Sequence, residues 1–471
     1  MKRIDADILI VGGGSAGFGA AYRALKKGMR VVLAEKYDIL GGTSTVGGVN
    51  SWEPGVSGKG VHYRLAERLL ESGDGFVGET TFFCGSGRPF AVSDRSQDSY
   101  ESTLHRFGVT PEKQRRFHFE PDALASVMRS LLDEAGESRL TALMNASFVS
   151  LSGGAGQISE VDFETPLGHA TVFPKIVVDC TGSIAVARAA GCAYDIGENS
   201  NNEYGEAPAP EKRTKSLNGL TKCFLLERGK DIAPPEYLSE VDVSDYINQL
   251  RARGTVSCFN VCPRRSGSHK IGSDVLSGMV GADARINVNM LPTIEGEALL
   301  EHTPEEFERI LTARIYAYVG WLRENYGLAD WGISKIFPMN GIREDYRLIG
   351  KYVLTFNDEV NGFPPQMKEH IVAYADHPAD THGKGGGLRP TGVYGIPYEC
   401  LLPCGSMAEN LIVACRGASF SHIAASSARL SRTMLALGEA AGNAAALSVK
   451  ENIPLPEFSG EMIRSLIPTK P

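Results

Sequence analysis

The sequence DILIVGGGSAG, residues 7–17, decides the fold of the N-terminal region. Asp7–Val11 is short, rich in branched apolar residues and followed at once by glycine, which is typical of a buried parallel strand. We expect a helix over Ser15–Lys27, ended by Gly28, and a second strand over Arg30–Ala34. This order predicts a βαβ unit that carries its glycines in the first strand-to-helix turn.

Each glycine of the turn has a physical role in binding a dinucleotide. Gly12 permits the tight turn, Gly14 lets the backbone approach a pyrophosphate, and Gly17 lets the helix pack close to the strand. The helix N-terminus offers free N–H groups and the positive end of the helix dipole to the phosphates. The predicted phosphate-binding turn consists of Gly12, Gly13, Gly14, Ser15, Ala16 and Gly17.

An acidic residue closes the second strand. Glu35 lies eighteen residues beyond Gly17, where a carboxylate accepts hydrogen bonds from ribose hydroxyls. The same charge repels a 2′-phosphate, so NADP is disfavoured at this site. The neighbouring Lys36 is included in the predicted site.

Three further segments favour FAD over NAD. The loop over 41–50 (GGTSTVGGVN) is rich in backbone donors and small hydroxyls, although a flexible surface loop is the alternative interpretation. A buried strand over 175–179 ends in Thr181-Gly182, and a strand over 410–414 runs into Arg416. A long helix is expected from Ser427 to Val449, where small residues such as Gly438 and Gly442 permit close backbone approach.

These motifs resemble the FAD-dependent oxidoreductase family of glutathione-reductase-like flavoproteins, with fumarate reductase and succinate dehydrogenase flavoproteins as distant relatives. The resemblance rests on GGGSAG, GGTSTVGGVN, VVDCTG, GIREDYRLIGKYVLT (341–355), YGIPYECLLP (394–403) and the C-terminal stretch that begins NLIVACRGASFSH. It covers most of the chain, although 51–110 and 195–330 carry little signal.

The resemblance implies roles for individual residues. Gly42, Thr43 and Ser44 would line the phosphate and ribityl side of the flavin, Phe148 would lie near the adenine, and Arg416 near the pyrophosphate or the ring. The succinate dehydrogenase group attaches FAD through a histidine in the loop after the acid, and residues 41–50 contain no histidine. We therefore expect noncovalent FAD.

The composition bounds the class of protein. With 471 residues the chain is expected to form two or three domains. The net charge of −8 argues against nucleic acid as the main ligand. No apolar run approaches the roughly 18–20 residues that cross a bilayer. Nine cysteines without framework or metal spacing indicate structural thiols, no metal site and a cytoplasmic location.

The expected architecture is α/β, with a Rossmann-type FAD-binding domain and an inserted α+β substrate domain. The FAD-binding domain is expected to be discontinuous, from 1–50, 112–200 and 395–471. Residues 51–111 would form an insertion near the flavin, and 201–394 the substrate or cap domain. Helices are predicted over Asp122–Ala135 and Pro304–Tyr326.

Candidate catalytic residues lie late in the chain. His382 precedes a glycine run and could exchange a proton near neutral pH; an exposed loop histidine is the alternative. Arg343 could clamp an anionic or polyhydroxy substrate, or pair with Glu344 at a domain interface. His422, six residues after Arg416, could lie over the flavin or pack behind it.

Three functional hypotheses follow. The first is hydride transfer between flavin N5 and a small polar substrate, either a sugar-like alcohol or an acid. The second is fumarate-reductase-like reduction of an activated C=C bond. The third, of another class, is a flavoprotein subunit of an electron-transfer complex without a small-molecule substrate of its own. The electron acceptor is unknown, and a homo-oligomer is compatible with the sequence.

Overall fold

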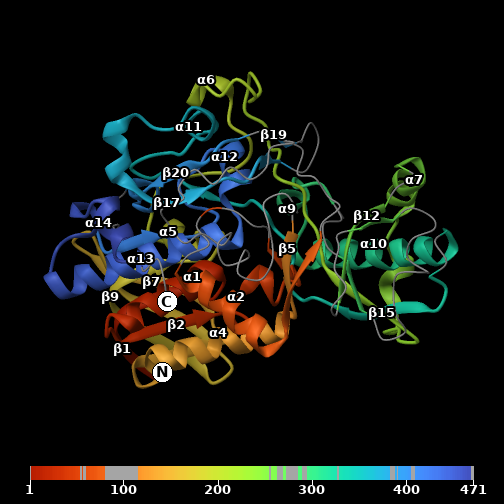
Figure 1. The fold of residues 1–471 in the computed structure, drawn as a ribbon, viewed down its shortest axis with the longest axis horizontal. Helices are drawn as coiled ribbons and strands as arrows, with labels where there is room; N and C mark the ends of the chain where they lie inside the picture. Colours follow the sequence, from red (N-terminus) through yellow and green to blue (C-terminus); the bar gives the residue numbers. More distant parts are fainter. Residues whose placement is uncertain are drawn as a thin grey trace.

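The computed structural model consists of a larger body with a smaller lobe on one side (Figure 1). It describes residues 2–52, 56, 60–79, 115–253, 256–262, 269–271, 285–288, 294–325, 328–381, 388–389, 391–404 and 409–467. His382, a candidate catalytic residue, lies outside the described residues.

The larger body is built around a seven-stranded sheet, counted over the described residues. Its strands are β1 (Lys2–Val11), β2 (Val31–Glu35), β6 (Leu140–Met144), β7 (Ser147–Gly154), β8 (Gln157–Thr165), β9 (Gly168–Asp179) and β21 (Leu411–Val413). The order is β6-β2-β1-β9-β8-β7, and β21 also pairs with β9. The pairs β6–β2, β2–β1, β1–β9 and β9–β21 are parallel, whereas β7, β8 and β9 are antiparallel. The α/β prediction is confirmed.

Alternating side chains of β1 belong to two different hydrophobic cores. Ile8 and Ile10 belong to one hydrophobic cluster, whereas Leu9 and Val11 belong to another. This is the period of two that a strand buried on both faces requires. The first cluster lies under α1 (Ser15–Lys26), α4 (Pro121–Gly136) and α13 (Ser431–Glu451), and α1 packs against both α4 and α13.

Several sequence-based boundaries were wrong, including the start of β9, which lies at Gly168 rather than at Lys175. The first strand begins at Lys2 rather than Asp7, because Lys2–Ala6 pair with Ala170–Pro174 of β9. The helix expected over Ser427–Val449 is two helices, α12 (His422–Ala428) and α13, separated at Arg429 and Leu430. Leu430 has an extended backbone, which redirects the chain before α13 begins.

Residues 51–79 and 115–119 form a small unit beside α4. They contain β3 (Ser51–Trp52), α2 (Val61–Ser72), β4 (Gly75–Glu79) and β5 (Arg115–Phe119), with the strand order β3-β5-β4. Trp52, Phe117 and Phe119 pack together inside it. The predicted insertion, 51–111, therefore shares its sheet with a strand that follows it.

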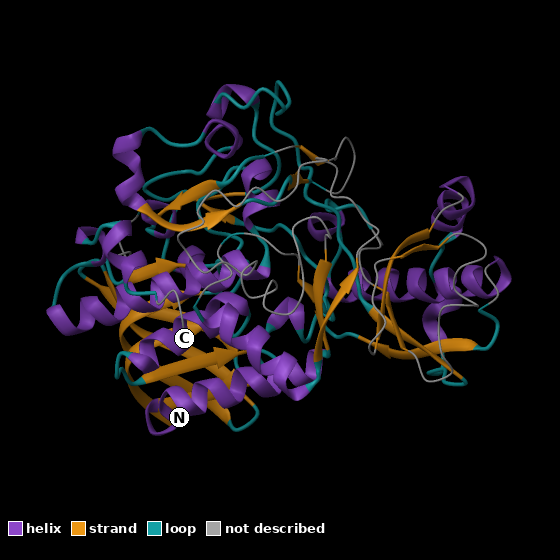
Figure 2. Ribbon diagram, viewed as in Figure 1, coloured by secondary structure: helices purple, strands orange, loops and turns teal. Residues whose placement is uncertain are grey.

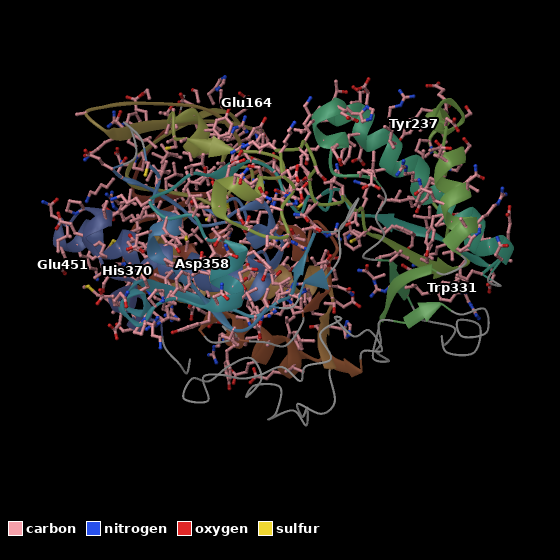
Figure 3. All side chains as sticks on the ribbon, turned by 90° about the horizontal axis from the view of Figure 1, so that it is seen from above. Glu164, Tyr237, Trp331, Asp358, His370 and Glu451 are labelled. Carbon is pink, nitrogen blue, oxygen red and sulfur yellow. The ribbon has the colours of Figure 1, made fainter. Side chains whose placement is uncertain are left out.

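The smaller lobe contains a five-stranded antiparallel sheet (Figure 2). Its order is β13-β12-β14-β11-β15. The strands are β11 (Phe224–Arg228), β12 (Val256–Cys262), β13 (His269–Ile271), β14 (Arg285–Val288) and β15 (Trp331–Ile336), and the helices are α7 (Ser244–Arg253), α9 (Ala298–Glu301) and α10 (Pro304–Asn325). Figure 3 shows Tyr237 and Trp331 in this lobe, away from Glu164 and Glu451 in the larger body.

The remaining elements cover the C-terminal helices. They are α5 (Ala185–Ala189), β10 (Tyr194–Asp195), α6 (Asn201–Tyr204), β16 (Arg347–Leu348), α11 (Phe356–Asn361), β17 (Ile371–Ala375), β18 (Ala379–Asp380), β19 (Leu388–Arg389), β20 (Tyr394–Pro397) and α14 (Gly460–Ser465). Short 3-10 turns occur at η1 (Gly42–Ser44), η2 (Glu137–Arg139), η3 (Glu236–Glu240), η4 (Pro365–His370), η5 (Tyr398–Leu401) and η6 (Leu455–Glu457). Strand β17 packs against α13 and α14. The described helices include none long and apolar enough to cross a membrane.

Candidate functional site

Two glycines of the first turn of the βαβ unit, Gly12 and Gly17, leave no room for a side chain. Gly12 has φ +100°, and a Cβ there would overlap the carbonyl oxygen of Cys180 on the neighbouring strand end. A Cβ on Gly17 would overlap the carbonyl oxygen of Gly12. The turn is therefore compressed between β9 and its own helix, as the glycine pattern predicts.

The N-terminus of α1 opens into a cavity of about 610 Å³. Ser15 and Ala16 line it, and their N–H groups precede the first intrahelical bonds. Gly14 is the N-cap and has no side chain to occupy these donors. The loop that follows β2 joins the same wall, because Gly41 N–H donates to the Gly13 carbonyl at 2.9 Å.

Glu35 lies at the carboxyl end of β2 and also lines the cavity. Its Oε2 accepts a hydrogen bond from Gly13 N–H at 2.6 Å, and its Oε1 accepts one from Tyr37 N–H at 3.0 Å. Burial raises the pKa of Glu35, and these two N–H donors oppose that rise. Lys36 lines the cavity as well, and burial lowers its pKa.

The turn after β9 adjoins the glycine turn and also lines the cavity. Asp179 is buried, and its Oδ1 accepts hydrogen bonds from Thr181 N–H at 3.0 Å and Thr181 Oγ1 at 2.8 Å. Gly182 has φ +80°, and a Cβ there would overlap the Arg416 guanidinium, which comes from the end of β21. The Nε of Arg416 is buried and has no hydrogen-bond partner among the residues that the structure describes.

Most of the predicted cofactor residues meet in this cavity. Those that line it are Gly12, Gly14, Ser15, Ala16, Glu35, Lys36, Gly42, Thr43, Phe148, Thr181, Gly182 and Arg416. The structure places Gly13, Gly17 and Ser44 behind that wall. The Oγ of Ser44 accepts from Trp52 Nε1 at 3.2 Å and lies 3.1 Å from Ser431 Oγ.

Of the candidate catalytic residues, Arg343 lies beside the cavity. Its neighbour Ile342 lines the wall, and Arg343 Nη1 donates to the Gly219 carbonyl at 2.7 Å. Burial, together with the positive charge of Arg429, lowers the pKa of Arg343 to about 10, although Asp380 opposes the shift. The expected alternative partner Glu344 instead forms an ion pair with Arg347.

His422 lies in a buried network rather than in the cavity wall. Its Nδ1 is 2.9 Å from the carboxylate of Glu344, and its backbone N–H donates to Asn199 Oδ1 at 3.2 Å. Although burial opposes ionisation, His422 and Arg347 keep the pKa of Glu344 below its usual value. These contacts favour a structural role for His422.

The sequence patterns missed one whole side of the cavity. It is formed by Leu299, His302, Pro304, Phe307, Met339, Asn340, Ile342 and Asp345, together with Arg429, Ser431 and Met434 before and at the start of α13. The first group comes from α9, the start of α10 and the segment after β15. Ile342, Asp345 and Arg429 lie in stretches that carry the family resemblance, but no sequence pattern assigned any of these residues to the site, because folding alone brings them to the glycine turn.

The donor set of the cavity fits FAD. The open helix N-terminus suits a pyrophosphate, Glu35 suits ribose hydroxyls, and the unpartnered Nε of Arg416 suits an anionic or carbonyl oxygen. The volume of about 610 Å³ lies within the roughly 300–1,000 Å³ of cofactor pockets.

Comparisons with known proteins agree with this fit. Over 316 residues the chain is 23% identical to a urocanate reductase of Eggerthella lenta, with 59% of this chain and 48% of that protein covered. It is 52% identical over 50 residues to an NADH:acrylate oxidoreductase of Vibrio harveyi, covering 10% and 5%, and 43% identical over 54 residues to a 4-oxocyclohex-2-ene-1-carboxylate 5-dehydrogenase of Sinomonas cyclohexanicum, covering 12% and 9%. The matched part thus spans about half of the first relative and under a tenth of the others.

Similar solved structures include a p-nitrophenol 4-monooxygenase from Pseudomonas putida, with a TM-score of 0.44 and 11% identity over 96% of this chain and 82% of that one. A myxobacterial chondrochloren halogenase gives a TM-score of 0.45 and 10% identity over 98% and 78%. The model of one family, FAD dependent oxidoreductase, matches residues 7–466. The chain therefore belongs to the FAD dependent oxidoreductase family, and FAD is its cofactor.

Proposed function

We propose that the protein transfers a hydride between noncovalently bound FAD and a small carboxylic acid. The observation that carries this proposal is the electrostatic influence of Arg429, which lines the FAD cavity, on Arg343, which lies beside the cavity and follows the lining residue Ile342. Arg429 lines the cavity, and its positive charge contributes to the lowered pKa of Arg343.

A carboxylate between these two arginines would offset their mutual repulsion. Arg429 Nη2 donates to the Asp380 carbonyl at 3.2 Å, and Arg343 Nη1 donates to the Gly219 carbonyl. A backbone carbonyl therefore holds each of the two side chains in place. Asp380 opposes the lowering of the pKa of Arg343. Planar guanidinium groups bind carboxylates through paired hydrogen bonds.

FAD and the nearby side chains would have different roles in the reaction. FAD, when bound, supplies two-electron hydride chemistry. Arg343 and Arg429 would hold the acid and set its orientation. His382 remains our candidate for the proton that accompanies hydride transfer; it follows Thr381, a buried residue directly after β18.

Two of the relatives, the urocanate reductase and the NADH:acrylate oxidoreductase, favour reduction of an activated C=C bond, whereas the third is named as a dehydrogenase. The names of the relatives above contain urocanate, acrylate and an oxocyclohexene carboxylate, and each of these words denotes a carboxylate. A carboxylate substrate held by two arginines is consistent with such a reaction. Oxidation of a hydroxy acid or a sugar-like alcohol is the competing direction at the same site.

The test is an anaerobic reaction of the reduced and the oxidised holoenzyme with unsaturated acids, hydroxy acids and sugars, followed by flavin absorbance. Oxidation of reduced flavin by an unsaturated acid supports the reductase reading, and bleaching of oxidised flavin by a hydroxy acid supports the oxidative one. We expect R343Q to raise KM for the acid by roughly ten- to a hundredfold, the range of a hydrogen bond between charged groups.

R309Q is the matched control, because Arg309 pairs with the exposed Glu240 on the smaller lobe. R429Q must be read together with its FAD content, because Arg429 lines the cofactor cavity. An unchanged KM in R343Q would contradict the proposal that Arg343 binds the carboxylate of the substrate. Flavin that responds to no small molecule, but is reduced or oxidised by a protein partner, would favour the electron-transfer subunit instead.

A further inference from the structure

A buried lysine of the smaller lobe contacts Asn340, one of the cavity-lining residues that the sequence patterns did not identify. Lys222 follows Thr221 shortly before β11, and its side chain is only 1% exposed. Its Nζ donates to Glu308 on α10 at 3.0 Å, to Asn340 Oδ1 at 2.9 Å and to the Pro338 carbonyl at 3.4 Å. These three partners match the three N–H donors of an ammonium group, so Lys222 has none left for a ligand.

The lysine determines which way the Asn340 amide points. An ammonium group has no acceptor, so the amide atom that faces Lys222 must be the oxygen. The two N–H donors of Asn340 are therefore on the other branch of the amide. Asn340 lines the FAD cavity, whereas Lys222 does not.

The backbone on both sides of Asn340 is also held. Gly341 N–H donates to the Thr221 carbonyl at 2.7 Å, and Met339 N–H donates to the Val46 carbonyl at 3.3 Å. The second bond joins this segment to the loop after β2, whose Gly42 and Thr43 line the same cavity. Asn340 is thus fixed by its side-chain oxygen and by its neighbours, and among the described residues no partner is found for its side-chain N–H groups.

We propose that Asn340 is a cofactor-binding residue that donates a hydrogen bond to an acceptor on FAD, and that Lys222 is the positioning residue that orients it. The acceptor is an oxygen or nitrogen of either the pyrophosphate or the isoalloxazine ring, because both present acceptors and no donor would fit that amide branch. This assignment depends on FAD binding and not on the identity of the substrate.

The test titrates flavin-free protein with FAD and follows the flavin fluorescence. N340L removes the donor at similar size, and N340D retains an oxygen for Lys222 but replaces the donor with a second oxygen. We expect the Kd for FAD to rise about five- to tenfold in N340L and at least as much in N340D, the range of one hydrogen bond. K222M should also raise the Kd, because the amide is then free to turn.

The double variant K222M/N340L separates orientation from general damage. If Lys222 acts through Asn340, the double variant binds FAD no more weakly than N340L alone. Multiplied effects in the double variant, or a wild-type Kd in N340L, would overturn the proposal. R309M, which removes an exposed ion pair on the same helix as Glu308, should keep the wild-type Kd, and melting of each flavin-free variant reports its folding.

Two further readouts identify the acceptor. If Asn340 donates to the pyrophosphate, the directly measured Kd for ADP rises in N340L by about the same factor as the Kd for FAD. If it donates to the ring, ADP affinity stays unchanged and the visible flavin spectrum shifts. If the Kd for ADP, the visible flavin spectrum and the Kd for FAD all match those of the wild type, Asn340 is not a cofactor ligand.

Discussion

Gly438 of α13 lies directly against Ala16 of α1, so that a Cβ on Gly438 would overlap the Ala16 carbonyl oxygen. The contact repeats along the helix pair, because a Cβ on Gly19 would lie 2.6 Å from the carbonyl oxygen of Leu435. Ala16 also lines the FAD cavity. The C-terminal helix therefore supports, from behind, the helix whose N-terminus faces the cofactor.

Replacing Gly438 by alanine should push α13 away from α1. We expect G438A to lower the free energy of unfolding by about 1–3 kcal/mol, the cost of overpacking a tight contact, and to weaken FAD binding. Thermal unfolding and FAD titration measure both effects. Gly320 in the helix α10 is the matched control, because a Cβ there meets nothing within 4 Å. G320A should stabilise by roughly 0.5–1 kcal/mol; equal losses in both variants would contradict the contact.

Glu35 should bind FAD through its charge and both of its oxygens. E35Q leaves only one acceptor for the N–H groups of Gly13 and Tyr37 and removes the charge offered to ribose hydroxyls. We expect the Kd for FAD to rise about tenfold, which corresponds to roughly 1.4 kcal/mol. The melting temperature of the flavin-free variant is the control. A lower melting temperature with an unchanged Kd would assign Glu35 to the loop alone.

Trp52 should stabilise the loop after β2 through one hydrogen bond to Ser44. Its Nε1 donates to Ser44 Oγ, which lies 3.1 Å from Ser431 Oγ at the start of α13. W52F keeps an aromatic ring in the cluster with Phe119 and removes that donor. We expect a loss of about 0.5–1.5 kcal/mol in unfolding free energy, measured by denaturant titration. S44A should give a similar loss, and W52F/S44A no further loss if the two side chains act together.

Glu359 should make the protein less stable as the pH rises. It is buried near Tyr394, and burial, with the nearby charges of Glu206 and Asp358, raises its pKa well above the usual value, although the nearby hydroxyl of Tyr394 opposes this rise. The folded protein therefore holds the proton more tightly than the unfolded chain. The stabilisation is full below the unfolded pKa and is lost as the pH rises toward the folded one, by up to about 1.4 kcal/mol per pH unit.

E359Q tests this sign, because glutamine resembles the protonated acid and does not titrate. The unfolding free energy of the variant, measured between pH 5 and pH 8, should fall less with pH than that of the wild type. The variant should be the more stable protein at the alkaline end. A parallel pH dependence in the two proteins would show that Glu359 does not titrate in this range.

The sequence alone was sufficient to predict that the glycine turn and Glu35 of the βαβ unit line the cavity. Gly12, Gly17 and Glu35 follow one another within a single βαβ unit, and the demands of a tight turn and a ribose carboxylate are local ones. The same holds for Thr181-Gly182 and Arg416, each of which follows the end of a parallel strand. Parallel strands bring their carboxyl ends to one edge, so residues at those ends meet wherever the strands pair.

Only the tertiary structure decided what stands opposite that edge. Asn340, Phe307 and Arg429 reach the cavity from the smaller lobe and from the break between α12 and α13, and no local pattern announces them. Ser44 carries the right chemistry in the right loop but turns to Trp52, a contact that depends on packing of the inserted unit. The glycine turn thus specifies the cofactor through short-range backbone constraints, whereas the opposing wall depends on long-range packing that places a lysine behind an asparagine.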